Sequence, residues 1–314
     1  MNAAAFVEQQ IDVIRNEIKG MAIAALSGGI DSTVAAVITR MAVGDRLTAV
    51  HIDTGLMRKN ETDLLLKAVE GLDLKVKIVD ASEMFFKALE GVADPEEKRK
   101  RIGAAFIEVF SREAGMVGAE YLVQGTIAPD WIESGGGVRD RIKSHHNVGG
   151  LPQELHLKLI EPLRDLYKDE VRDVAKYLGI GWVERQPFPG PGLAVRVLGP
   201  VDKEKIQIER EACAIVEEEI QKAHASGRIE ELPWQYFSVL LPVRSVGVRG
   251  DVRSYGYTLV IRAVKSKDAM TARFSRLPHE LLEDISTTIT NRLPQITRVV
   301  YDITNKPPGT IEWE

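Results

Sequence analysis

An apolar segment, MAIAAL at residues 21–26, runs directly into the hexapeptide SGGIDS and then into a helical pattern at residues 32–42. This order predicts a β-strand that feeds an α-helix through a glycine hinge. Glycine lets the backbone approach a ligand closely, and the first turn of a helix offers unpaired N–H groups to anionic oxygens. The feature favours an α/β fold with a phosphate-binding loop; the alternative is an ordinary turn with a serine or aspartate cap.

The residues around these glycines exclude two common phosphate loops. A Walker A loop would need a lysine followed by serine or threonine, and a dinucleotide-binding loop would need three spaced glycines. Ser-Gly-Gly-x-Asp-Ser meets neither requirement. It resembles the pyrophosphate loop of the ATP pyrophosphatases, which cleave ATP between its α and β phosphates.

Strand and helix patterns continue to alternate after the loop. The expected strands are residues 46–52, 74–79 and 121–123, and the expected helices are residues 61–70, 81–89 and 95–114. Such alternation is typical of a doubly wound parallel sheet with helices on both faces, which binds ligands at the carboxyl ends of its strands. Ser27, Asp53 and the segment 124–126 all follow strands, so we expect one site at this edge.

A proline- and glycine-rich stretch at residues 186–193, QPFPGPGL, predicts a stiff connector. A chain of 314 residues exceeds what one core usually organises, so we expect two domains, 1–195 and 196–314. Short links around the expected strands at residues 235–246 and 257–264 favour a smaller α+β second domain with a mixed or antiparallel sheet.

Composition limits the partners and the compartment. The net charge of −5 and the pI near 5.8 lack the basic footprint of a nucleic-acid-binding protein, so no nucleic-acid partner is expected. No apolar run approaches the ~20 residues of a membrane helix, and the N-terminus lacks the form of a signal peptide. We therefore expect a cytoplasmic protein without membrane contact. Cys213, the single cysteine, lies in an amphipathic helix pattern that predicts a packed thiol.

Residues 131–152 interrupt the alternation with five glycines and a group of basic residues. An irregular segment of this length favours a lid over phosphates, with a surface loop as the alternative. Lys143, His145 and His146 would stabilise charge that develops on a transferred phosphoryl group. Adjacent histidines rarely chelate one ion, so they do not predict a metal site.

Four carboxylates near the expected strand ends are candidate ligands. Asp31 would repel a phosphate unless a cation intervenes, so we expect it to bind Mg²⁺; a carboxylate that caps its own helix is the alternative. Asp53 would hold the ribose or adenine of ATP, or simply form a turn. Asp130 and Glu133 at the lid entrance would bind a second metal, orient the lid, or form a solvated pair.

From residue 21 to residue 314 the chain resembles the synthetase portion of the GMP synthases. The motifs that carry the resemblance are SGGIDS, DTGLMR, GTIAPDWIES, IKSHHNVGGLP, PFPGPGLAVRVLG, LPVRSVGVRGD and RVVYDITNKPPGTIEWE. A glutaminase domain with a Cys-His-Glu triad is missing, so the resemblance implies the stand-alone synthetase subunit of a two-subunit enzyme. Such a subunit takes free ammonia or receives it from a separate glutamine amidotransferase.

The resemblance also implies a fold, a reaction and site residues. The first domain would have the adenine nucleotide α hydrolase-like fold of the N-type ATP pyrophosphatases, and the second would form a homodimer. ATP, with Mg²⁺, would adenylylate the C2 oxygen of XMP and release pyrophosphate, after which ammonia would displace AMP to give GMP. The implied pyrophosphate- and ATP-binding residues are Ser27, Gly28, Gly29, Ile30, Asp31, Ser32 and Asp53. The implied catalytic residues are Asp31, Asp130, Glu133, Lys143, His145 and His146, and the implied XMP-binding residues are Arg99, Gln235, Arg298, Lys306, Ile311 and Glu312.

The chain departs from the family pattern at a few places. Ile30 replaces a common valine, Gly309 replaces a common alanine, and the lid is short between Glu133 and Ile142. Two alternatives stay open: another pyrophosphate-loop ligase, such as an NAD synthetase-like or tRNA-modifying enzyme, and a non-catalytic adenine nucleotide sensor.

Overall fold

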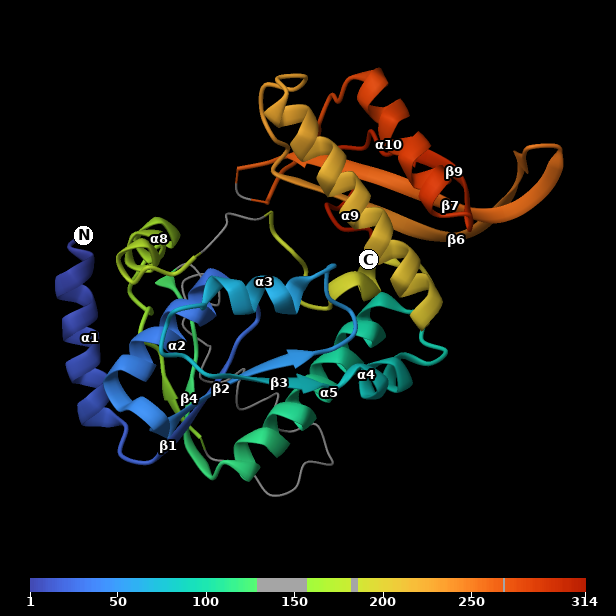
Figure 1. Cartoon of the computed structure of the whole chain (residues 1–314). Coiled ribbons are helices and arrows are strands. Elements are labelled where there is room, and N and C mark those ends of the chain that lie inside the picture. The colour runs from blue at the N-terminus through green and yellow to red at the C-terminus, as the bar shows by residue number, and fades with distance from the viewer. Residues whose placement is uncertain (129–156, 182–185, 268) are drawn as a thin grey trace. The chain divides into compact units, whose positions relative to one another are not determined.

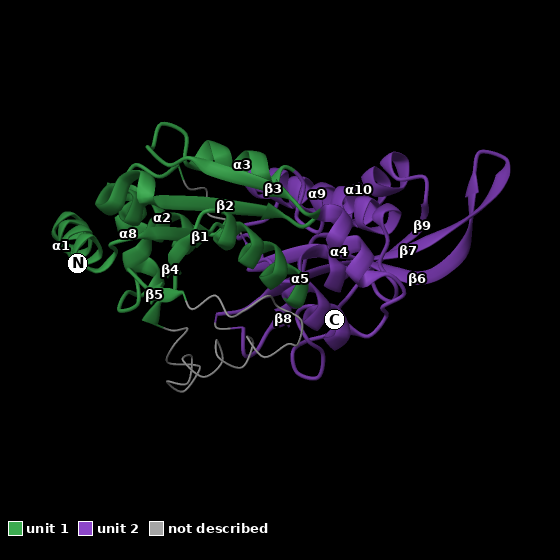
Figure 2. Cartoon of the chain, turned by 90° about the horizontal axis from the view of Figure 1, so that it is seen from below, with its two compact units in different colours: residues 1–54, 60–81, 104–184 green, residues 55–59, 82–103, 185–314 purple. Residues whose placement is uncertain are grey.

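The structure, a computed structural model, describes residues 1–128, 157–181, 186–267 and 269–314. The chain forms two compact units (Figure 2). The first comprises residues 1–54, 60–81 and 104–184, and the second residues 55–59, 82–103 and 185–314. Two early segments thus belong with the C-terminal part of the chain, and the domain boundary at residue 195 stays a prediction.

The first unit is built on a five-stranded sheet in the order β3-β2-β1-β4-β5 (Figure 1). Its strands are β1 (Met21–Ala25), β2 (Leu47–Asp53), β3 (Val76–Asp80), β4 (Ala119–Val123) and β5 (Lys158–Ile160). All neighbouring pairs are parallel, and Ile23 of β1 lies opposite Thr48 of β2 and Leu122 of β4. The strand order reverses at β1, so the predicted doubly wound parallel sheet is confirmed.

The helices of the first unit include one that is mostly buried. Among the described residues they are α1 (Ala3–Glu17), α2 (Ile30–Val43), α3 (Glu61–Ala68) and α8 (Lys168–Tyr177), with a short 3-10 turn η1 (Gly44–Arg46). Helix α5 (Pro95–Met116) begins in the second unit and ends in the first. Helices α1, α2 and α8 pack on one another. Most residues of α2 are buried, among them Val34 and Ile38, which join the core of the sheet.

The second unit contains a mixed sheet and two long helices. Its elements are α4 (Ser82–Leu89), the 3-10 helix η2 (Gly192–Arg196), α9 (Lys203–Ala225), β6 (Gln235–Arg249), β7 (Val252–Lys265), β8 (Arg273–Phe274), α10 (His279–Arg292) and β9 (Ile296–Tyr301). Strand β7 pairs antiparallel with β6 and β8 and parallel with β9. Helix α9 packs on β6 and α10 on β9. The predicted α+β fold of the second unit is confirmed.

Several boundaries differ from the sequence-based expectation. Helix α2 begins at Ile30 instead of Ser32, because Gly29 takes the N-cap position in an extended conformation. Strands β6 and β7 extend to Arg249 and Val252, since Gly250, with φ of +56°, closes a tight hairpin. Strands β5 and β8 were not expected because two or three residues carry too little pattern.

No helix in the part of the chain that the structure describes combines the length and apolar composition that a membrane crossing requires.

Candidate active site

The glycine loop follows β1 and opens α2. Gly28 has φ of +80°, and Gly29 is the N-cap of α2. The hydroxyl oxygens of Ser27 and Ser32 lie 3.2 Å apart, and Ser32 Oγ donates to the Gly29 carbonyl at 3.1 Å. No side chain of the described residues caps the helix, so the N–H groups of its first turn remain available to anionic oxygens.

Two glycines at this site allow a close approach that a side chain would prevent. A Cβ atom on Gly28 would lie 2.9 Å from Glu61 Oε1, and the positive φ disfavours other residues. A Cβ atom on Gly125 would lie 2.6 Å from the carbonyl carbon of Asp31 and from the nitrogen of Ser32. The segment after β4 therefore meets the first turn of α2, as expected for strand ends that share one edge of the sheet.

Asp31, the candidate magnesium ligand, is paired with Lys168. Lys168 Nζ lies 2.5 Å from Asp31 Oδ2, while Asp31 Oδ1 is buried without a hydrogen-bond partner among the described residues. A carboxylate oxygen of this kind fits Mg²⁺, which prefers oxygen ligands from one or two carboxylates, water and substrate phosphates. Within the described ranges no three His, Cys, Asp or Glu side chains gather into a metal cage, so a magnesium ion here would depend on the nucleotide.

Lys168 was not among the residues inferred from sequence. It is the first residue of α8, where the helix dipole disfavours a cation. A lysine at such a position is a signal that could have identified it, because the unfavourable placement needs a partner.

Asp53 ends β2 beside Asp80 of β3, and Ala81 N donates to its carbonyl at 2.9 Å. It therefore lies at the carboxyl edge of the sheet, as expected, while its contact with ATP stays a prediction.

His51, two residues before Asp53, supports the loop and was missed by the sequence analysis. It is buried; its Nδ1 lies 2.8 Å from the Leu26 carbonyl oxygen and its Nε2 lies 3.1 Å from Thr62 Oγ1. Since a carbonyl only accepts, Nδ1 donates to the Leu26 carbonyl. His51 thus ties the end of β1 to the start of α3.

The predicted lid residues Asp130, Glu133, Lys143, His145 and His146 lie outside the described residues, and their roles stay predictions.

In the second unit, the structure brings together two of the predicted XMP-binding residues, Gln235 and Glu312. Gln235 Nε2 donates to Glu312 Oε1 at 2.8 Å. Arg196 holds the same carboxylate, with Nη2 donating to Oε1 at 2.8 Å and Nε donating to Oε2 at 3.0 Å. Arg196 was not expected at the site from the sequence, although a charge inside the apolar run LAVRVL is unusual without a partner.

A fully buried acid, Glu209 of α9, lies in the same cluster. Glu209 Oε1 accepts hydrogen bonds from Ser238 Oγ at 2.8 Å and from Cys213 Sγ at 3.1 Å, and the sulfur lies 3.7 Å from Arg196 Nη1. Burial raises the pKa of Glu209 to about 8, so this carboxyl group is largely protonated at neutral pH. Burial, together with Glu209, also raises the pKa of the Cys213 thiol, and the prediction of a packed thiol is confirmed.

Arg99, another predicted XMP-binding residue, contacts the tail, which we define as residues 306–314. Arg99 Nη2 donates to the backbone carbonyl of Glu314 at 2.5 Å. The neighbouring Lys98 is fully buried; it forms an ion pair with the Glu314 side chain and donates to the carbonyls of Ala194 at 3.2 Å and Val197 at 2.7 Å. These contacts anchor the tail two residues beyond Glu312.

The remaining predicted XMP-binding residues make other contacts. Lys306 Nζ donates to the Ala269 carbonyl at 2.9 Å, and Ile311 is buried. Arg298 is exposed on β9, where its Nε donates to Ser245 Oγ at 3.3 Å. The tail therefore gathers part of the predicted set, whereas Arg298 contacts strand β6.

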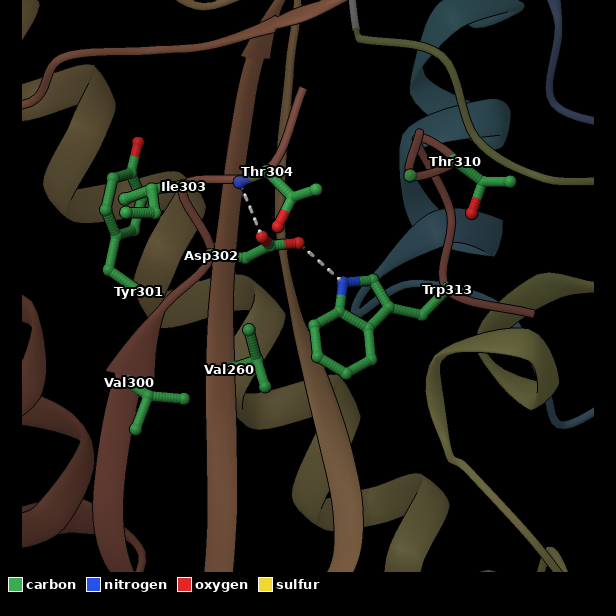
Figure 3. Close-up of a pocket in the computed structure, with 9 residues that line it drawn as sticks. Val260, Val300, Tyr301, Asp302, Ile303, Thr304, Thr310 and Trp313 are labelled. Atoms are coloured by element: carbon green, nitrogen blue, oxygen red, sulfur yellow. Dashed lines mark hydrogen bonds between the residues drawn. The ribbon is translucent and has the colours of Figure 1, made fainter. Parts of the chain in front are cut away.

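A pocket of about 450 Å³ lies in the second unit, next to the tail (Figure 3). Its lining consists of Val260, Val300, Tyr301, Asp302, Ile303, Thr304, Gly309, Thr310 and Trp313. Asp302 accepts hydrogen bonds from Trp313 Nε1 at 3.0 Å and from Thr304 N at 2.8 Å. None of the six predicted XMP-binding residues belongs to this lining, so we do not assign the pocket to that nucleotide.

Two family models match separate parts of the chain. Residues 2–106 match the model described as NAD synthase, and residues 218–313 match the model described as GMP synthase C terminal domain. The parallel sheet, the glycine loop and the first match together define a protein with the pyrophosphate-loop α/β fold.

Relatives that match the chain over its whole length identify its family within this class of fold. The chain is 55% identical to a subunit of the glutamine-hydrolyzing GMP synthase of Thermoplasma acidophilum, over 100% of both chains. It is also 55% identical to the subunit of the same name from Pyrococcus horikoshii, over 100% of both chains. The chain belongs to this family of GMP synthase subunits.

Two further likenesses are more partial. The glutamine-hydrolyzing GMP synthase of Aeropyrum pernix is 53% identical over 98% of this chain, which covers 60% of that relative. Among solved structures, the NH3-dependent NAD synthetase of Campylobacter jejuni aligns with a TM-score of 0.42 and 20% identity, over 57% of this chain and 75% of that chain. The structural likeness is too slight to support an argument.

Proposed function

We propose that this chain catalyses the ATP-dependent amination of XMP to GMP. The observation that carries the proposal is the 55% identity to a GMP synthase subunit across the whole chain, together with an uncapped helix N-terminus behind the glycine loop. In the proposed reaction the C2 oxygen of XMP attacks the α-phosphorus of ATP and pyrophosphate leaves. Ammonia then adds to C2, and AMP departs with the former C2 oxygen.

The residues of the first unit suit the first of these steps. The N–H groups at the start of α2 would bind the departing pyrophosphate, and Ser27 and Ser32 would keep the loop in shape. Asp31 would hold Mg²⁺, which supplies charge neutralisation on the phosphate oxygens. Lys168 would stay close to the same charges, because it is paired with Asp31.

The residues of the second unit would bind XMP. Glu312 and Gln235 share a hydrogen bond, and Arg99 contacts the tail that carries Glu312, so these three would form one part of the nucleotide site. Lys306, Ile311 and Arg298 complete the proposed set. The lid residues Asp130, Glu133, Lys143, His145 and His146 would close over ATP.

We also propose that ammonia comes from a separate glutamine amidotransferase subunit or is taken up free. The name of the Aeropyrum relative includes glutamine hydrolysis, and that protein extends well beyond the region matched by this chain. A homodimer is proposed as well. In support of it, five large apolar side chains on the outer parts of β6 and β7 are more than half exposed: Val243, Val246, Val248, Val252 and Tyr255. The cytoplasmic location stays a prediction.

The test is to incubate the purified chain with Mg-ATP, XMP and ammonium chloride and to measure all products. We expect GMP, AMP and pyrophosphate with ammonium, and no GMP with glutamine alone. ADP with orthophosphate would contradict the proposal. NAD synthetase-like or tRNA-modifying activity and a non-catalytic nucleotide sensor are not favoured by the comparisons.

A variant pair examines the loop. Asp31→Ala should lower turnover by about 100-fold or more, because the carboxylate that would hold Mg²⁺ at the phosphates is lost. Asp12→Ala, which removes an exposed carboxylate on α1, is the matched control and should leave turnover unchanged. Near-normal turnover of Asp31→Ala would remove Asp31 from the proposed site.

A further inference from the structure

Arg196, the last residue of η2, is an enclosed cation. Its side chain is 1% exposed, and its guanidinium carbon lies 4.1 Å from the ring centre of Phe237 and 5.1 Å from that of Phe188. Contact with two aromatic rings restricts the plane of the guanidinium group. Burial is the largest single influence and opposes the charge, but the surrounding acidic groups, Glu312 foremost, together raise the pKa of Arg196, which therefore stays cationic.

Glu312, the partner of Arg196, is less enclosed and keeps 18% of its side chain exposed. Among the residues that the structure describes, three hydrogen bonds reach its carboxylate, two from Arg196 and one from Gln235. A carboxylate has about four acceptor positions, so about one remains. The remaining acceptor position lies on Oε2, which receives only one of these three hydrogen bonds. Glu312 can therefore accept one further N–H or O–H group.

The two side chains that hydrogen-bond to Glu312, Gln235 and Arg196, also contact other parts of the unit. Gln235 Nε2 also donates to the Pro187 carbonyl at 3.2 Å, and Arg196 Nη1 lies 3.7 Å from the sulfur of Cys213. Helix α9, strand β6 and η2 thus all contribute to one arrangement. A site residue supported in this way keeps its orientation before the ligand arrives.

We propose that Arg196 is a positioning residue. It keeps the carboxylate of Glu312 oriented, so that the remaining acceptor position on Oε2 receives one N–H or O–H donor of the purine nucleotide. The inference rests on the proposed function, in which Glu312 contacts XMP. Arg196 acts through Glu312, because its own enclosure leaves no surface for the nucleotide.

The test compares Arg196→Lys with a matched control in the same unit. Lysine keeps the positive charge but cannot form the bidentate pair of hydrogen bonds that Arg196 donates to the Glu312 carboxylate. Arg262 is an equally buried arginine; it pairs with Asp302 at 3.1 Å and donates to the Thr310 carbonyl of the same tail at 2.9 Å. Arg262→Lys therefore loosens the tail without touching Glu312.

The affinity for XMP is measured by calorimetry without ATP, and kcat and the separate KM values for XMP and ATP are measured in the amination assay. Arg196→Lys should weaken XMP binding and raise the KM for XMP by about 10- to 100-fold, the range expected for a lost charged hydrogen bond. Its KM for ATP should stay within about twofold of the wild-type value. Arg262→Lys should lower the melting temperature and leave the affinity for XMP within about twofold.

Three results would overturn the proposal. Arg196→Lys could bind XMP as tightly as the wild type, or Arg262→Lys could weaken XMP to the same extent, which would assign the effect to a loosened tail. If the wild type does not bind XMP at all, both this inference and the proposed function fail. If it binds XMP but makes no GMP, only the proposed function fails. Should Arg196→Lys not fold, Glu312→Gln replaces it in the test: weaker XMP binding supports the proposal, and unchanged binding refutes it.

Discussion

The buried carboxyl group of Glu209 provides a prediction with a sharp pH signature. Burial raises its pKa to about 8, from an ordinary value of 4.5. The group is therefore protonated in the native state at a pH where it is ionised in the unfolded chain. Its contribution to stability is fully present below pH 4.5 and is lost as the pH rises towards 8.

Replacing Glu209 with glutamine removes this titration and keeps the shape of the protonated group. The amide oxygen can still accept from Ser238 and Cys213. Each pH unit corresponds to about 1.4 kcal/mol. The free energy of unfolding of Glu209→Gln minus that of the wild type should therefore increase by about 1.4 kcal/mol per pH unit between pH 5 and 8. The total gain should be about 4–5 kcal/mol, levelling off at higher pH.

The assay is urea unfolding of both proteins at pH 5, 6, 7, 8 and 9, with the difference taken at each pH. Gln207→Ala, a change without a titratable group at an exposed position on the same helix, is the control and should give a difference that does not vary with pH. A difference for Glu209→Gln that is flat between pH 5 and 8 would refute the reasoning, because Glu209 would then be ionised in the native protein.

Three further outcomes follow from the same structure. Gly125→Ala should lower the free energy of unfolding in urea by about 1–3 kcal/mol, because the new methyl group meets the backbone of α2. The control, Gly103→Ala, should not lower this free energy, because the space around Gly103 is open. Equal losses of stability in the two variants would contradict the packing argument. Lys98→Met should cost about 3–5 kcal/mol in the same assay by leaving the Glu314 carboxylate without its cation, and Lys98→Met/Glu314→Gln should recover part of that loss. Native Cys213 should resist thiol reagents at pH 8 and react quickly in urea; rapid modification of the folded protein would mean that burial does not suppress its thiolate.

Local patterns predicted the elements of the first unit because the information is local. The apolar run, the glycine pair and the helical spacing in residues 21–42 are sufficient for a strand, a loop and a helix. The long hairpin of the second unit was underestimated for a physical reason. Gly247 and Gly256 indicate breaks in a strand, but a Cβ atom on either would lie within 2.9 Å of the Thr297 side chain. These glycines make room for β9 and do not end their strands.

The partners of the site residues were harder to predict because they are distant in sequence. Lys168 lies 137 residues from Asp31, and Glu312 lies 116 residues from Arg196. No periodicity connects such positions, so a sequence pattern identifies Asp31 and Glu312 but not the cations that hold them. The resemblance to a family named the ligand-binding candidates, whereas the buried supports Arg196 and His51 became visible only through packing.

The interleaving of the two units limits how this enzyme can be recombined with its relatives. Residues 55–59 and 82–103 fold with the C-terminal unit, and one of them, Lys98, neutralises a buried carboxylate at Glu314. A chimera with a single crossover near residue 195 would take these segments from one parent and their packing partners from the other. Exchanging the C-terminal unit therefore requires that residues 55–59 and 82–103 be exchanged together with it.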